Sequence, residues 1–134
     1  MSANLTAHVV AYLCCDDAAS AIDFYSAAFG AVEQSRLVMD DNRVGHAELQ
    51  IGSTTLYLSD EWPEMNVRSP RHLGGNAVSF VLHVEDADVA FQRALAAGAD
   101  AERPLTDSPH GYGGWLRDPW GHRWNIMSPS RGSA

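Results

Sequence analysis

The stretch DPWGHRWNIM (Asp118–Met127) lies close to the end of the 134-residue chain and is typical of a tight turn that leads into a strand. In the Asp-Pro-x-Gly turn, proline fixes φ and glycine accepts the left-handed backbone position. Alternate side chains of the strand then point to opposite faces of a sheet, which places Trp124 on the core face and Asn125 on the other face. The stretch therefore predicts the closing strand of a sheet and raises the question of what Asn125 does there.

The same order of elements occurs twice along the chain. Each copy has a strand, an acidic pair, an apolar stripe at helical spacing and a terminating glycine, and Asp17 of the first pair can cap its helix. In the first copy these are His8–Cys15, Asp16–Asp17, residues 18–29 and Gly30; in the second they are Val78–Val84, Glu85–Asp86, residues 87–97 and Gly98.

Three further strands are predicted after each helix. They are Val32–Met39, Val44–Ile51 and Thr54–Ser59 in the first copy, and Ala99–Pro104, Trp115–Arg117 and His122–Met127 in the second. The chain is therefore predicted to be an α+β protein of two βαβββ modules, at about residues 7–60 and 77–128, in a single domain. The polar linker EWPEMNVRSPRHLGGN, residues 61–76, joins them.

The composition and charge of the chain exclude several classes of partner and location. A hydrophobic content of 46% with 19% charged residues is typical of a globular protein, and the net charge of −8 without a Lys/Arg cluster argues against nucleic acid. The apolar run Ala7–Cys15 follows no basic segment and is too short to cross a bilayer, so neither a signal peptide nor a membrane anchor is expected. Adjacent Cys14 and Cys15 are expected to be reduced thiols of a cytoplasmic protein, with a redox or nucleophilic role as the alternative.

Four stretches resemble the vicinal oxygen chelate superfamily in their order and spacing. They are AYLCCDDAASAIDFYSAAFGA, GHAELQIGSTTLYLSDE, ALAAGAD and RDPWGHRWNI. That superfamily includes glyoxalase I, extradiol dioxygenases, fosfomycin resistance enzymes and bleomycin-binding proteins, and the chain looks most like its PhnB-like branch. The resemblance runs from about Val9 to Ser128. It implies paired modules that form a cupped mixed sheet with the helices outside, a ligand on the concave face, and a homodimer.

The resemblance also implies where a metal would lie. Metal-dependent members place one ligand on the first and one on the last strand of each module, at positions that fall at about Val10, Leu58, Ser79 and Asn125 in this chain. None is a histidine or an acid, and Asn125 stands where the family usually has glutamate. A catalytic divalent metal needs about three His or carboxylate ligands. We therefore expect no metal and no other cofactor at the usual site.

The stretch GHAELQ (residues 45–50) offers different chemistry. Strand alternation predicts that His46, Glu48 and Gln50 face the cup while Ala47 and Leu49 face the core. Three readings stay open: a hydrogen-bonded or solvated face, an acid–base pair of His46 and Glu48, and a relocated Zn, Fe, Mn or Ni site that adds His83.

Other side chains are candidates for ligand binding. Tyr12 and Trp115 are suited to stacking on a flat molecule, Arg123 to binding an anionic group, and HGYGGW (residues 110–115) to forming a mobile lid. The full set expected to contact a ligand comprises Tyr12, Gln50, Leu58, Ser79, His83, Trp115, Arg123 and Asn125.

Two functions remain. In the first, the protein binds a small aromatic or heterocyclic molecule without transforming it, for antibiotic resistance or sequestration, as the bleomycin-resistance proteins that it resembles do. In the second, it is a lyase, isomerase or dioxygenase that uses His46 and Glu48 as an acid–base pair or as relocated metal ligands. The absence of the usual metal ligands favours the first.

Overall fold

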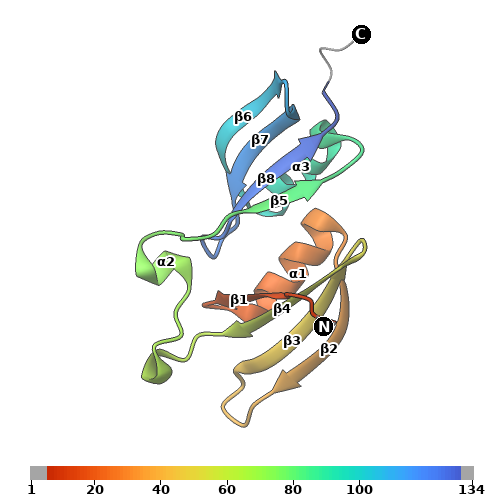
Figure 1. The fold of residues 1–134 in the computed structure, drawn as a ribbon. Coiled ribbons are helices and arrows are strands. Elements are labelled where there is room, and N and C mark those ends of the chain that lie inside the picture. The colour runs from red at the N-terminus through yellow and green to blue at the C-terminus, as the bar shows by residue number, and fades with distance from the viewer. Residues whose placement is uncertain (1–5, 131–134) are drawn as a thin grey trace, which may run out of the picture.

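The computed structural model describes residues 6–130, which form two four-stranded sheets and the helices that cover them (Figure 1). The strand order is β1-β4-β3-β2 in sheet 1 and β5-β8-β7-β6 in sheet 2. The strands are β1 (Ala11–Cys15), β2 (Val32–Val38), β3 (Val44–Ile51), β4 (Thr54–Asp60), β5 (Phe80–His83), β6 (Asp100–Ser108), β7 (Gly111–Arg117) and β8 (Arg123–Ser128). In each sheet the first strand of the module runs parallel to the last, and the other pairs are antiparallel. The predicted α+β fold of two βαβββ modules is confirmed.

The two long helices begin and end as the sequence predicts. In α1 (Ala18–Phe29), the Asp17 side chain accepts a hydrogen bond from the Ser20 backbone N–H at 3.2 Å. The helix ends at Gly30, whose φ of 70° is left-handed and costs glycine no steric strain. In α3 (Ala87–Ala97), the Asp86 side chain caps the Val89 N–H at 3.2 Å. The repeated acidic pair is therefore a repeated helix start.

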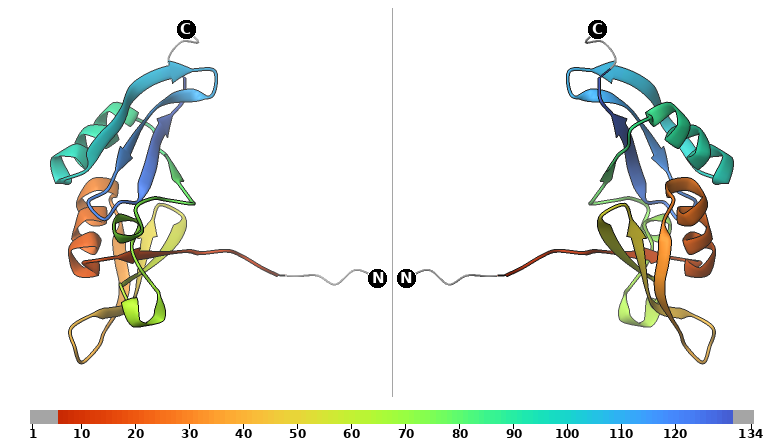
Figure 2. Two further views of the ribbon diagram at one scale, coloured as in Figure 1. Left: turned by 90° about the vertical axis from the view of Figure 1, so that its left-hand side faces the viewer. Right: turned by 90° about the vertical axis from the view of Figure 1, so that its right-hand side faces the viewer.

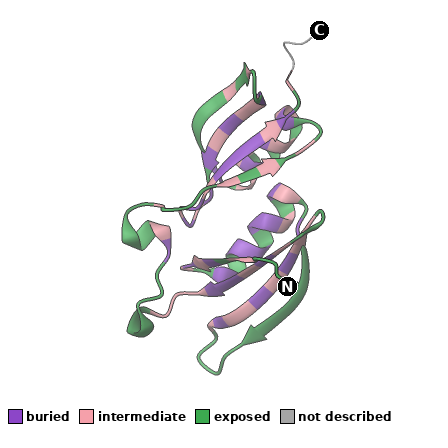
Figure 3. Ribbon diagram, viewed as in Figure 1, coloured by how far each residue is buried: buried purple, intermediate pink, exposed green. Residues whose placement is uncertain are grey.

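Helices α1 and α3 lie side by side on one side of both sheets (Figure 2). In the inner strands β3 and β7 buried residues alternate with more accessible ones, whereas the edge strands β2 and β6 are largely exposed (Figure 3). The side of each sheet away from its helix is called here the open face. Helix α1 also joins the modules through an inter-module aromatic cluster, in which ring centroids lie 4.7 to 5.7 Å from their nearest neighbours. Its members are Phe24, Tyr25 and Phe29 of α1 and Trp120 and Trp124 of the second module.

One buried carboxylate organises this junction. Asp118, which is 3% exposed, accepts a hydrogen bond from the Tyr25 hydroxyl of the first module. It also accepts hydrogen bonds at 3.0 Å from the Trp120 and His122 backbone N–H groups and from the Trp124 indole. The Asp-Pro-x-Gly turn is thus more than a reversal of the chain, because it attaches the second module to α1.

Several strand boundaries differ from the prediction; β6, for example, runs to Ser108 and not to Pro104. The first strand begins at Ala11 and not at His8, because its partner β4 starts only at Thr54, directly after the β3–β4 hairpin turn. The stretch expected to form a lid, residues 110–115, is instead mostly the start of β7, paired with β6 and β8. A Cβ on Gly113 would lie 2.8 Å from the Ile126 carbonyl oxygen, and one on Gly114 would lie 2.9 Å from that of Arg103. These glycines therefore let neighbouring strands approach closely.

The linker carries two short helices, η1 (Pro63–Met65) and α2 (Pro70–Leu73), and folds back on itself where Trp62 and Val67 exchange backbone hydrogen bonds of 2.8 and 2.9 Å. Across residues 6–130, every helix is too short or too polar to cross a membrane.

Candidate functional site

A chain of three polar side chains crosses the open face of sheet 1. The Tyr12 hydroxyl of β1 lies 2.7 Å from Nδ1 of His46 on β3, and Nε2 of the same imidazole lies 2.9 Å from Oε2 of Glu48. The sheet order brings them together, because β4 lies between β1 and β3 and its Tyr57 is in register with both Tyr12 and Glu48. The predicted parity of GHAELQ is confirmed: Ala47 and Leu49 are fully buried, while His46 and Glu48 point to the other face.

The direction of these hydrogen bonds follows from their chemistry. An ionised Glu48 carboxylate can only accept, so the proton of a neutral His46 lies on Nε2. Nδ1 then carries a lone pair and accepts from the Tyr12 hydroxyl. The three groups thus form an oriented chain in which Tyr12 donates to His46 and His46 donates to Glu48.

The aromatic rings fix this geometry. Tyr12, His46 and Tyr57 meet edge to face, with centroids 4.9 to 5.6 Å apart. Burial of the Tyr12 side chain and the nearby charge of Glu48 both raise the pKa of its phenol above the usual value of 10.0. Tyr12 therefore stays protonated at neutral pH and acts as a hydrogen-bond donor.

Tyr12 also borders a cavity of about 580 Å³, called here the sheet 1 cavity. Its apolar walls come from the end of β2 and from the linker: Leu37, Met39, Trp62, Met65 and Val67. Cys14, Gly45 and Ser59 line the remaining sides. His46 and Glu48 are not among its lining residues, so Tyr12 is the member of the hydrogen-bonded chain that borders the cavity.

The linker wall is held by charged side chains. The Arg43 guanidinium lies 4.1 Å above the Trp62 ring and pairs with Glu64 at 3.1 Å and Asp41 at 2.8 Å. Cation–π contact and ion pairing together orient the indole. The wall formed by Trp62 is therefore anchored to the β2–β3 turn.

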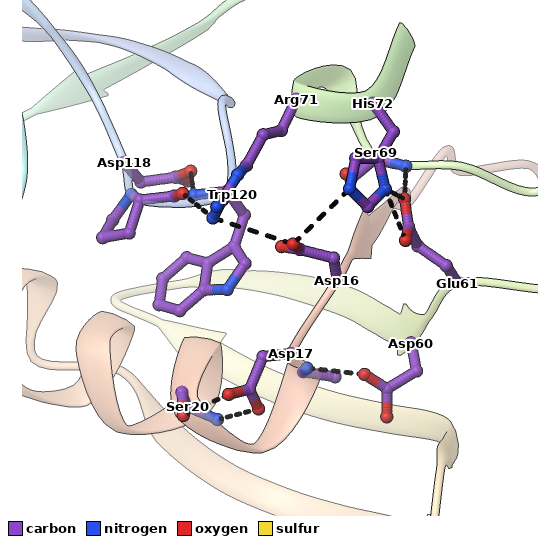
Figure 4. A network of polar contacts seen from close by, with 12 residues as sticks. Asp16, Asp17, Ser20, Asp60, Glu61, Ser69, Arg71, His72, Asp118 and Trp120 are labelled. Atoms are coloured by element: carbon purple, nitrogen blue, oxygen red, sulfur yellow. Dashed lines mark hydrogen bonds and ion pairs between the residues drawn. The ribbon is translucent and has the colours of Figure 1, made fainter.

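A second polar network fastens the rest of the linker to the first module (Figure 4). Glu61 accepts from the Ser69 backbone N–H and from His72, both at 2.7 Å, and Arg71 reaches Asp16 at 3.7 Å and the Pro119 carbonyl at 3.2 Å. Burial alone would raise the pKa of Glu61, but the hydrogen bonds from Ser69 and the pairing with His72 outweigh it and lower this pKa. The network thus links both modules to the linker that borders the cavity.

The open face of sheet 2 carries a separate constellation. The Arg123 guanidinium stacks 3.8 Å above the Trp115 ring, bonds Glu102 at 2.7 Å and reaches the Ser79 hydroxyl at 3.4 Å. Asn125, which is 9% exposed, has a buried Oδ1 without a hydrogen-bond partner among residues 6–130. Trp115 and Asn125 border a cavity of about 630 Å³.

The predicted ligand residues that meet a cavity therefore divide between the two sheets, with the exception of His83. Tyr12, with His46 and Glu48 behind it, belongs to the sheet 1 cavity, whereas Ser79, Trp115, Arg123 and Asn125 gather on sheet 2. His83 ends β5 and borders a crevice between the modules instead.

Two expected residues are not available to a ligand. Leu58 is fully buried beside Leu13 and Ala47, so its predicted position is wrong by one residue and Tyr57 occupies the open face. The Gln50 amide is engaged by Thr55 and by the Gly52 carbonyl, both at 3.1 Å, at the far end of the strand. The linker residues Trp62, Met65 and Val67 were missed, because only the folded linker brings them to the cavity.

The usual metal positions do not fit a metal. Leu58 lies in the core, and Val10, Ser79 and Asn125 supply neither imidazole nor carboxylate. The relocated site does not form either, because no group of three or more His, Cys, Asp or Glu side chains is placed to hold a metal within residues 6–130. His46 and Glu48 are thus left as an imidazole–carboxylate pair without His83.

Comparison with known proteins agrees with this architecture. The family model of the Glyoxalase/Bleomycin resistance protein/Dioxygenase superfamily matches residues 6–126. The chain belongs to this superfamily. An uncharacterised superfamily relative from Mycobacterium tuberculosis is 43% identical over 136 residues, covering 98% of this chain and 79% of the relative.

Solved structures of the superfamily fold superpose over nearly the whole chain. TioX from Micromonospora sp. ML1 is 26% identical with a TM-score of 0.69, over 96% of this chain and 100% of its own. The fosfomycin resistance protein FosX from Mesorhizobium loti is 15% identical with a TM-score of 0.66, over 92% of each chain. At the latter identity the likeness shows the fold alone.

Proposed function

We propose that this superfamily member binds a small, flat, largely apolar molecule, aromatic or heterocyclic, in the sheet 1 cavity and sequesters it. The observation that supports this is a cavity of about 580 Å³ with an apolar wall and a hydrogen-bonding group at Tyr12. Small-molecule sites are usually concave and mostly apolar, with a few placed polar groups that fix orientation. A flat molecule of this kind would stack on Trp62 and hydrogen-bond to Tyr12.

The proposed binding needs no metal. The four positions that carry metal ligands elsewhere in the superfamily lack imidazole and carboxylate groups here, whereas apolar burial at this cavity supplies affinity by itself. Sequestration of an antibiotic, as in the bleomycin-resistance proteins that the sequence resembles, is one form of the proposed function.

The proposal includes a cytoplasmic homodimer. Cys14 and Cys15 are both free thiols, in keeping with a reducing compartment. Val9, at 97% exposed, precedes β1 on a segment that leaves the body of the molecule, and a partner chain would cover it (Figure 2). Light scattering on the purified protein would measure the mass of this assembly.

A thermal-shift screen tests the binding. The panel comprises indole, quinoline, 2-naphthoate, benzoate and 2-indanone, and we expect the flat neutral compounds to raise the Tm most, because the net charge of −8 disfavours anions. Met65→Ala removes part of the apolar wall, so calorimetry should give a Kd weaker by about tenfold. Met65 is 70% exposed, so the Tm of the free protein should change little.

Val89→Ala is the matched control, because Val89 is also an exposed apolar residue, at 55%, but lies on α3 away from the cavity. Its Kd should equal that of the wild type, and dialysis against a chelator should leave wild-type binding intact. Equal affinities of the Met65 and wild-type proteins would refute the site, and loss of binding after chelation would refute the metal-free mode.

A further inference from the structure

We propose that Tyr12, His46 and Glu48 form a proton relay that removes and returns a proton at the carbon next to the carbonyl group of a flat ketone bound in the sheet 1 cavity. This inference rests on the proposed function, because the substrate occupies the same cavity. It adds an activity, proton transfer, to what is otherwise a binding site.

The relay runs from the cavity along the open face, and without a ligand both of its ends are accessible, with Tyr12 54% exposed. Tyr12 lines the cavity and bonds His46 Nδ1 at 2.7 Å, and His46 Nε2 bonds Glu48 at 2.9 Å. The Glu48 side chain is 37% exposed, so its carboxylate is open to water. The three residues therefore connect the ligand cavity with solvent by two hydrogen bonds of ordinary length.

The proposed proton transfer needs only the substrate and the three side chains. The substrate C–H bond breaks and its proton passes to the Tyr12 oxygen, while the phenol proton passes to His46 Nδ1. The electron pair of the C–H bond stays on the substrate as an enolate, and His46 becomes an imidazolium beside the Glu48 carboxylate. Return of a proton along the same path to carbon gives exchange with solvent or a shifted isomer, and nothing is oxidised or reduced.

Tyr12 needs the imidazole for this role. Its raised pKa means that the phenolate is scarce at neutral pH, so Tyr12 passes a proton on and does not store the negative charge. Cys14 lines the same cavity, but burial and then the charges of Glu61, Asp60 and Asp16 raise the pKa of its thiol to about 11. That thiol stays protonated and does not compete as a base.

The test follows hydrogen–deuterium exchange by NMR. The probes are 2-indanone, 2-tetralone and phenylacetone in deuterium oxide, because all three are neutral, apolar and carry weakly acidic C–H bonds beside a carbonyl. Wild-type protein should exchange these positions faster than buffer does. Tyr12→Phe keeps the ring and removes the hydroxyl, so kcat should fall by about 10²-fold, whereas loss of the hydrogen bond to the ligand should raise KM by no more than about tenfold.

Tyr57→Phe is the matched control. Tyr57 lies on the same face and contacts both Tyr12 and His46, yet its hydroxyl has no hydrogen-bond partner among residues 6–130. Phenylalanine keeps the ring that packs on Tyr12 and His46, so loss of the Tyr57 hydroxyl alone should leave kcat unchanged. Glu48→Gln should lower kcat without raising KM, because Glu48 acts through His46 and does not touch the substrate.

The outcomes separate the two proposals. If the ketones bind in a Met65-sensitive manner but exchange no faster than in buffer, or if Tyr12→Phe and Tyr57→Phe behave alike, the relay is refuted and binding stands. If none of the three ketones binds but indole or quinoline does, the relay is refuted and the binding proposal stands. If no flat neutral compound of either set binds, both proposals fall.

Discussion

At the scale of single residues, the Asp118 carboxylate is a buried hydrogen-bond acceptor that joins the two modules. Its Oδ2 accepts from the Tyr25 hydroxyl and the Trp124 indole, and its Oδ1 accepts from the backbone N–H groups of Trp120 and His122. All four donors are buried, so each would lose its partner without regaining water if the carboxylate were changed. Burial, followed by the Asp118 charge, also raises the pKa of the Tyr25 phenol well above its usual value.

Asp118→Asn should therefore destabilise the protein by about 2–4 kcal/mol. The amide replaces one accepting oxygen by a donor, so two of the four buried donors face an N–H group. Urea unfolding followed by tryptophan fluorescence measures this change.

Asp100→Asn serves as the control. Asp100 is exposed at the start of β6 and makes no side-chain hydrogen bond or ion pair within the described chain, so its substitution should stay within about 0.5 kcal/mol of wild type. Equal effects of the two substitutions would show that Asp118 is not the organising group.

At the scale of elements, alternate side chains of β3 have different roles. Those on one face pack in the core and stabilise the fold, and those on the other face belong to the proposed relay. Leu49 is fully buried against the helix side, whereas Glu48 lies on the open face beside His46. Leu49→Ala should cost about 2–5 kcal/mol of unfolding free energy, as large-to-small changes in a core do. Glu48→Gln should change stability by less than about 1 kcal/mol, because its contact with His46 is part-exposed.

Chemical denaturation of the two variants tests this division. Similar losses in both would mean that the His46–Glu48 pair is a structural hydrogen bond, and its assignment to the relay would then fail.

Strand β3 also shows which features could be predicted from the sequence and which could not. The alternation of GHAELQ predicts both its faces, and the bounds of β3 and the caps of both helices follow from local signals. The contact between Tyr12 and His46 does not, because it spans two strand intervals and depends on β4 lying between β1 and β3. Likewise, the start of β7 was not predicted, because Gly113 and Gly114 have low strand propensity. In the structure these glycines let the neighbouring strands approach closely.

Errors of one residue have a large effect in strands. Matching Leu58 to a family ligand position placed it on the open face, but a single-residue step reverses the side-chain direction, and Tyr57 lies there instead. The walls of the cavity were beyond prediction for another reason. Trp62, Met65 and Val67 belong to a linker without periodicity, whose path is set by Arg43 and the Trp62–Val67 pairing.

At the scale of the whole molecule, the two modules are separate sheets with a shared core. Rings of α1 pack directly on Trp120 and Trp124, and the His122 imidazole donates to the Cys14 carbonyl at 2.8 Å. Removing the second module would expose the apolar face of α1 to water. The first module therefore has no complete core of its own.

A fragment of residues 1–62 should accordingly show no cooperative unfolding transition. Its aromatic face would remain uncovered, and its apolar area is small for an independent domain. Thermal melting followed by circular dichroism measures this, and adding residues 63–134 as a second fragment should restore a cooperative transition. A sharp, monomeric melt of the first fragment alone would contradict the shared core.

The Tyr25–Asp118 hydrogen bond also has a consequence during protein synthesis. Its partners are 93 residues apart, and a ribosome that adds about 5–20 residues per second needs about 5–19 s to bridge that interval. Helix formation and collapse take microseconds, so α1 forms long before its ring partners exist. For those seconds the nascent chain presents an unshielded aromatic stripe, the kind of surface that chaperones bind. Final closure of this protein waits for translation of the second module.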